Sequence, residues 1–131
     1  MKEIENINDI ELLVDEFYKK VVLDELIGRF FTVVVNFEWE VHIPIMVSFW
    51  ETVLFGKASY KGNPMTKHIE LNKLSKLEPV HFERWLDLWK ETVNENFIGE
   101  KASDAVSKAE TIAKLMQSKL NSNFTLIKNE S

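Results

Sequence analysis

The apolar residues of this chain recur at helical spacing, and two histidines, His42 and His68, stand inside apolar stretches of this kind. Around His42 the bulky side chains follow the i, i+3, i+4, i+7 pattern of one helical face, so the imidazole points the same way as they do. His68 follows one helical turn after Pro64, which closes a turn. Two imidazoles on separate apolar elements indicate a group held between them.

Length and composition favour one domain with one core. A chain of 131 residues can bury roughly two thirds of its unfolded surface. Hydrophobic residues make up 45% and aromatic residues 11% of the chain, and so many flat rings suit a flat ligand. We expect a single domain over residues 1–131, with a core over about residues 8–120 and a frayed tail over residues 121–131.

Charge and cysteine content exclude several classes of function. The formal net charge of −5 and the lack of clustered Lys and Arg argue against a nucleic-acid partner. Without cysteine the chain has no disulfide, no thiolate metal site and no cofactor attached through cysteine. The N-terminus is charged, and the most apolar stretch, residues 41–56, is interrupted by polar residues and too short to span a bilayer. We therefore expect a cytoplasmic protein with no membrane partner.

Start and stop signals predict helices along most of the chain. The expected helices run from Asn8 as cap to about Val21, through His42 to about Phe55 before Gly56, from Asn63 and Pro64 through His68 to about Leu71, from Pro79 to a stop at Gly99, and from Lys101 or Ala102 to about Leu120. Residues 24–31 are expected to add a short helical turn. Residues 72–77 are expected to form a polar linker.

Two segments are harder to interpret. Residues 32–35 have the composition of a strand, but a lone strand of four residues has no partner, so we expect an irregular connection or a short helix. Pro44 removes a backbone donor and is most easily accommodated in the first turn of its helix. His42 would then lie near the helix start, with room for its side chain to swing.

Common enzyme and side-chain metal motifs are missing from the sequence. A di-iron bundle needs two Glu-x-x-His pairs, whereas the chain offers only Glu78 and His81 around a proline. Glu38 and His42 are four apart, but Pro44 argues against a shared metal. There is no H-E-x-x-H zinc helix, Gly-x-Ser-x-Gly elbow, cysteine nucleophile or Gly-rich phosphate loop. His81 is interpreted as a helix-start residue that packs or caps, and Trp39, Trp50 and Trp89 as packing residues.

A haem fits the apolar helices and the two histidines better than a side-chain metal site does, because it is a large apolar disc that needs helices on both sides and an axial imidazole. The chain resembles the truncated haemoglobins, and among them group III, over roughly residues 8–120. The motifs are Phe17-Tyr18, Trp39-x-x-His42, Phe49-Trp50-Glu51, Tyr60-x-Gly62-x-Pro64-x-x-x-His68 and His81-Phe82-x-x-Trp85-Leu86. The paired glycines of groups I and II are missing. The resemblance implies an all-α, truncated globin-like fold, a two-on-two helical sandwich around a noncovalent haem b.

The resemblance also implies roles for individual residues. His68 matches the proximal histidine that ligates iron, and Tyr18, His42 and Trp85 match the distal polar set around the ligand. A phenol O–H and an indole N–H can donate to a ligand that carries partial negative charge. The remaining candidates are Met46 and Phe49 for the distal wall, Phe31 and Phe37 for the haem edge, and Lys57, Lys61 and Lys67 for the propionates.

The expected function is reversible binding of O2, NO or CO at a histidine-ligated iron. Oxygen handling or transport, nitric oxide dioxygenase-like activity and peroxidase-like activity would share this pocket, with an unidentified reductase as partner. A monomer or weak dimer is expected. The alternative is a haem-free helical protein–protein interaction module with an aromatic groove, and a third interpretation is a haem sensor.

Overall fold

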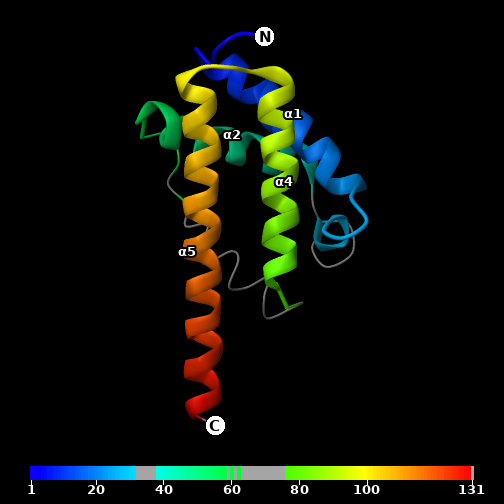
Figure 1. The fold of residues 1–131 in the computed structure, drawn as a ribbon, viewed down its shortest axis with the longest axis vertical. Helices are drawn as coiled ribbons and strands as arrows, with labels where there is room; N and C mark the ends of the chain where they lie inside the picture. The colour runs from blue at the N-terminus through cyan, green and yellow to red at the C-terminus, as the bar shows by residue number, and fades with distance from the viewer. Residues whose placement is uncertain (32–37, 59, 61, 63–75, 131) are drawn as a thin grey trace.

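The structure, a computed structural model, describes residues 1–31, 38–58, 60, 62 and 76–130, with side chains as far as residue 119. Its helices are α1 (Ile7–Leu23), α2 (Trp39–Phe55), α4 (Pro79–Asn96) and α5 (Glu100–Glu130). Figure 1 shows α4 and α5 side by side and antiparallel, with α1 and α2 crossing behind them. The all-α, two-on-two arrangement predicted from the sequence is confirmed.

The core lies where the two helix pairs meet, and Trp89 of α4 is at its centre. The Trp89 ring is fully buried. It stacks on Trp50 of α2 with centroids 4.3 Å apart and meets the edge of Phe17 of α1 at 4.9 Å. Its indole Nε1 donates to the carbonyl oxygen of Ala105 of α5 at 3.1 Å. One side chain therefore contacts all three neighbouring helices, as expected for a packing tryptophan.

Apolar stripes at helical spacing on α1 and α5 contribute much of this core. The stripe of α1 is buried along its whole length: Ile10, Leu13, Val14, Phe17, Tyr18 and Val21. On α5 the buried positions are mostly alanines: Ala102, Ala105, Ala109 and Ala113. Small side chains let the backbones of α4 and α5 approach closely.

The start of α1 differs from the prediction by two residues. The cap is Asn6, whose side chain accepts from the backbone N–H groups of Asn8 and Asp9, and Asp9 completes a capping box. The predicted cap, Asn8, lies inside the helix. The segment before the cap packs against the end of α4, since the Ile98 N–H donates to the Lys2 carbonyl at 2.9 Å. That long-range contact favours the earlier start.

Pro44 lies inside α2 and not in its first turn, which corrects the prediction. The helix begins at Trp39, and the His42 N–H already donates to the Glu38 carbonyl at 2.9 Å. Pro44 cannot donate to the carbonyl of Glu40, so α2 lacks one internal hydrogen bond there. The predicted end is confirmed: α2 stops at Phe55, and Gly56 takes the left-handed conformation with φ 68°.

The predicted start of α4 is confirmed, while two helix ends differ from the prediction. Pro79 is the first residue of α4, and the helix ends at Asn96, before the predicted stop at Gly99. Gly99, with φ 101°, instead lies in the connection to α5. The backbone of α5 continues to Glu130, beyond the predicted end near Leu120. The predicted helical turn over residues 24–31 is confirmed by helical backbone at residues 28–31.

Several predictions fall outside the described residues. They concern the strand-like segment 32–35, the short helix of residues 63–71 and most of the linker of residues 72–77. Within the described parts of the chain, none of the helices combines the length and apolar character that a membrane crossing needs.

Candidate functional site

Two of the predicted distal residues, Tyr18 and Trp85, come together around one phenylalanine. Phe17 meets the Tyr18 ring edge-on with centroids 5.0 Å apart and the Trp85 ring with centroids 5.9 Å apart. Trp85 also lies parallel to Trp89, with centroids 6.3 Å apart. The inner side of the Trp85 ring is thus packed on the core, while the residue as a whole is only half-buried.

Tyr18 is held more tightly than Trp85. Its side chain is 8% exposed, and the edge of Phe31 lies against its ring with centroids 5.8 Å apart. Burial raises the pKa of Tyr18, because the phenolate would lose its hydration. The phenol therefore keeps its proton at neutral pH and remains a hydrogen-bond donor.

His42 is fixed by its helix. It is half-buried and lies in the first two turns of α2, where its backbone is bonded to Glu38. Met46 follows one turn later on the same face. The regular backbone at His42 replaces the loose helix start that the sequence predicted, so any movement of the imidazole comes from side-chain rotation.

Half-buried apolar side chains line the edge of the core. They pack against the core on one side and keep part of their surface uncovered: Phe31, Met46, Phe49, Leu77, Trp85, Leu86 and Ile112. On α4 the contrast is sharp, because Trp89 and Val93 are fully buried whereas Trp85 and Leu86 are half-buried. A large apolar group could cover the uncovered surface.

Two further candidates, Phe49 and Lys57, are described, and the remaining ones lie outside the described residues. Phe49 meets the edges of Trp50 and Tyr60, with centroids 5.4 and 5.3 Å apart. Lys57 is mostly exposed and lies 3.9 Å from a carboxylate oxygen of Glu51. The proximal candidate His68, with Phe37, Lys61 and Lys67, falls outside the described residues.

His81 has the capping role that the sequence predicted. Its Nδ1 accepts from the Glu78 N–H at 2.9 Å, which completes a capping box at the start of α4. Glu78 and His81 therefore cap the start of α4. Among the described residues, no group of three or more His, Asp or Glu side chains could hold a metal ion.

An ion pair beside this site was not predicted. The Arg84 Nε donates to Asp24 Oδ1 at 2.7 Å, which joins the end of α1 to α4 one residue before Trp85. Partial burial alone would raise the pKa of Asp24, but the N–H groups of Ile27 and Leu26 and the Arg84 guanidinium lower it below its usual value. The two residues are 60 positions apart, and no sequence motif connects them.

Two grooves on the described surface lie away from these residues. One, of about 570 Å³, lies between α1 and α2 and is lined by residues such as Leu12, Pro44 and Glu51. Another, of about 660 Å³, lies at the end of α4 and the start of α5. Neither shares a residue with the candidate set.

Comparisons with known proteins agree on one family. The family model of the bacterial-like globins matches residues 3–121. The group 3 truncated hemoglobin ctb of Campylobacter jejuni is 31% identical over 118 residues, which cover 88% of this chain and 91% of that protein. The crystal structure of the group III truncated hemoglobin from Campylobacter jejuni superposes with a TM-score of 0.80 at 31% identity, covering 92% of this chain and 95% of the other. This chain therefore belongs to the bacterial-like globins, as a group III truncated haemoglobin.

Proposed function

We propose that this chain holds a noncovalent haem b and binds O2, NO or CO reversibly at its iron. Membership of the globin family makes it a haem-binding protein. The observation that supports ligand binding is the pairing of a buried Tyr18 with a half-buried Trp85 around Phe17. Both can donate a hydrogen bond, and both border apolar surface that the core leaves uncovered.

The described residues fit a haem by their chemistry. The uncovered surface is apolar and partly aromatic, as the faces of a porphyrin require. It is contributed by Phe31, by α2, by α4 and by α5. In the described residues, every buried side-chain nitrogen and oxygen atom has a hydrogen-bond partner.

A bound haem would supply an iron that a histidine could hold and that could bind a small ligand. His68 is the residue that we assign as the axial ligand. Met46, Phe49, Phe31 and Leu86 would contact the porphyrin faces and edge, with Phe37 and Lys67 as further candidates.

The distal residues act by donating hydrogen bonds. The protonated phenol of Tyr18 and the indole N–H of Trp85 stabilise a small ligand that carries partial negative charge. His42 adds a third polar group from α2. Because such donors slow ligand release and also polarise an O–O bond, oxygen handling and nitric oxide or peroxide chemistry remain alternative uses of one pocket.

Reconstitution with hemin tests the proposal. The purified chain titrated with hemin is expected to give a stoichiometric Soret band, which shifts when the reduced protein receives CO. His68→Ala is expected to lose the axial imidazole and the spectrum of a histidine-ligated haem. His81→Gln is the matched control, because His81 caps α4, and it is expected to keep that spectrum. A stably folded protein that gains no Soret band would refute haem binding and favour the interaction module.

A further inference from the structure

The helical turn of residues 24–31, which follows α1, contacts α4 at two points. At its start, the Asp24 carboxylate accepts from the Leu26 and Ile27 N–H groups, each at 3.1 Å, and from the Arg84 Nε at 2.7 Å. Near its end, the Phe30 ring meets the edge of the His81 ring, with centroids 4.9 Å apart. The turn cannot move relative to α4 without breaking one of these contacts.

The same turn places the residue that packs on Tyr18. Phe31 belongs to this turn, and its ring lies edge-on against Tyr18 with centroids 5.8 Å apart. Gly28 allows the turn to lie close against α1, because a Cβ at that position would be only 2.8 Å from the Val22 carbonyl oxygen. The position of the Tyr18 ring therefore depends on the turn.

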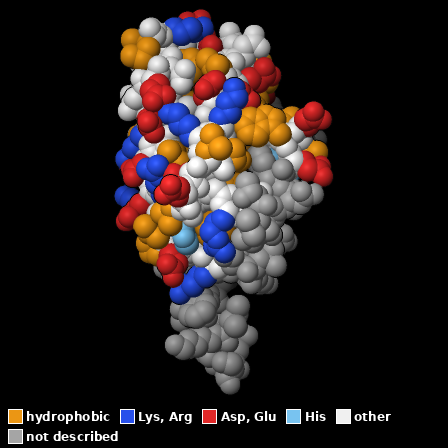
Figure 2. All heavy atoms as spheres, turned by 90° about the vertical axis from the view of Figure 1, so that its right-hand side faces the viewer, with side chains coloured by type: hydrophobic (Ala, Val, Ile, Leu, Met, Phe, Trp, Pro, Cys, Tyr) orange, Lys and Arg blue, Asp and Glu red, His pale blue; other side chains and the backbone are white. Residues whose placement is uncertain are grey.

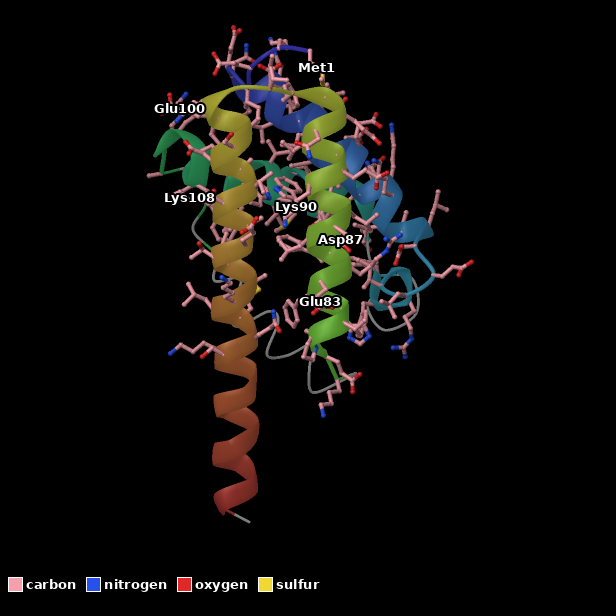
Figure 3. All side chains as sticks on the ribbon, viewed as in Figure 1. Met1, Glu83, Asp87, Lys90, Glu100 and Lys108 are labelled. Carbon is pink, nitrogen blue, oxygen red and sulfur yellow. The ribbon has the colours of Figure 1, made fainter. Side chains whose placement is uncertain are left out.

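One face of α4 serves both the turn and the ligand site. His81, Arg84 and Trp85 are spaced i, i+3, i+4, so they project from one side of the helix. Glu83 and Asp87 lie at other positions around α4 and are exposed (Figure 3). The side of the molecule turned toward the viewer in Figure 2 carries charges of both signs, in keeping with the ion pairs between Lys20 of α1 and α4.

The Asp24 carboxylate is the buried member of its pair. It is 6% exposed, whereas the Arg84 side chain is 44% exposed. Loss of Arg84 leaves a buried carboxylate without its cation, which is more disruptive than loss of an exposed ion pair. Hydrogen bonds weaken steeply as their distance and angle depart from the optimum. A small displacement of the turn would therefore change how Tyr18 and Trp85 meet a ligand.

We propose that Asp24 and Arg84 are positioning residues of the ligand pocket: by clamping the turn of Phe31 to α4, they set how Tyr18 and Trp85 lie relative to each other. They control ligand release without touching the ligand. The proposal rests on the proposed function, since it assigns the distal pocket to those two donors.

Three variants of the Asp24–Arg84 pair test the proposal. Asp24→Asn keeps an oxygen for the Leu26 and Ile27 N–H groups but can no longer pair with Arg84. Arg84→Met removes the charge while keeping the length of the side chain. Both are expected to change the O2 dissociation rate of the reduced haem protein by about three- to tenfold in stopped-flow measurements. Arg84→Lys keeps a cation able to replace the single Nε–H donor, and it is expected to retain most of the wild-type rate.

A spectroscopic measurement separates positioning from loss of stability. The infrared stretching frequency of bound CO responds to nearby hydrogen-bond donors, so it is expected to shift or split in Asp24→Asn and Arg84→Met and to return in Arg84→Lys. The double variant Asp24→Asn/Arg84→Met is expected to change the rate no more than the stronger single variant, because both act on one interaction. Glu83→Gln is the matched control one residue away, and it is expected to change neither the rate nor the frequency.

The outcomes distinguish this proposal from the proposed function. If wild type takes up hemin and binds O2, but Asp24→Asn and Arg84→Met keep the wild-type rate and CO frequency, the positioning role is wrong and the function stands. Full additivity in the double variant would also overturn it. If wild type binds no hemin, the proposed function itself fails, and the Asp24–Arg84 pair has no ligand pocket to position.

Discussion

Tyr18 and Trp85 are both donors near neutral pH, but for different reasons. Burial holds the proton on the Tyr18 phenol, and an indole N–H does not titrate. We expect Tyr18→Phe and Trp85→Phe each to raise the O2 dissociation rate about tenfold or more, because a hydrogen bond to a charged group contributes roughly 1.5–3 kcal/mol. Stopped-flow displacement of O2 by CO measures the rate. Tyr60→Phe, which also removes one hydroxyl, is the control, and unchanged rates in both test variants would show that the distal set is misassigned.

Asp9 and Asp24 are two residues at which pH acts on stability. Burial opposes ionisation of Asp9, but the Glu5 N–H at 2.8 Å and the Lys2 ammonium at 3.2 Å lower its pKa, as Arg84 and backbone N–H groups lower that of Asp24. A lowered folded-state pKa stabilises the protein above the unfolded value of about 3.9, and this stability is lost as the pH falls through the folded value.

Acid unfolding followed by circular dichroism checks this expectation. Wild type should lose stability as the pH falls from about 5 toward 2, and Asp9→Asn/Asp24→Asn should start less stable and lose less over that range. Asp87→Asn, at an exposed carboxylate of α4, should follow the wild-type curve. Parallel curves for the double variant and wild type would mean that these two carboxylates do not carry the acid sensitivity.

At the scale of the elements, helix identity was predictable, whereas the starts of α1 and α2 were not. The apolar stripes of α1, α4 and α5 follow from periodicity alone, because a helix must bury one face. For α1, however, both Asn6 with Asp9 and Asn8 with Glu11 fit a capping box. The choice between them rests on contacts of the N-terminal segment with Phe97 and Ile98, far away in the sequence.

Pro44 shows the same limit of local rules. Proline is favoured in the first turn, which would start α2 several residues later than observed. The helix instead begins at Trp39, whose ring packs against the core. Tertiary packing of the preceding residues outweighs the hydrogen bond that Pro44 removes, and a propensity rule does not include that packing.

The turn of residues 24–31 predicts a steric effect at Gly28. A Cβ there would lie 2.8 Å from the Val22 carbonyl oxygen and 3.1 Å from that of Val21, so the turn must shift. We expect Gly28→Ala to lower the free energy of unfolding by about 1–3 kcal/mol and to raise the O2 dissociation rate, because Phe31 moves with the turn.

Denaturant unfolding and stopped-flow kinetics on the same samples measure the two effects. Gly56→Ala is the control, since it carries strain from φ 68° but meets nothing within 4 Å. It should lose about 1 kcal/mol while the dissociation rate stays at the wild-type value. A Gly28→Ala variant as stable as wild type would mean that the turn does not pack this closely on α1.

At the scale of the whole molecule, the distal site depends on pairs that are remote in sequence. The ordered motifs predicted that Tyr18 and Trp85 serve one pocket, but the means of joining them, Phe17 and the Asp24–Arg84 pair, emerge only from the way α4 packs on α1. Charged residues are common on helix surfaces, so nothing in a single sequence distinguishes Arg84, which pairs with Asp24, from its neighbour Glu83. Pairing partners 60 residues apart requires the fold.

The half-buried apolar surface of α4 and its neighbours has a consequence for the stability of the whole chain. A group that covers this surface in the folded state alone stabilises that state by mass action, by about 2.7 kcal/mol when its free concentration is 100 times its Kd. We therefore expect excess hemin to raise the calorimetric Tm by several degrees, since each kcal/mol shifts the Tm of a domain this size by roughly 4 °C.

His68→Ala should show a much smaller rise, because the axial bond is lost. His81→Gln should unfold at a lower temperature without hemin, having lost a cap of α4, yet show the full wild-type rise on hemin addition. An equal rise in wild type and His68→Ala would mean that hemin adheres to the apolar surface without the axial histidine that we assign.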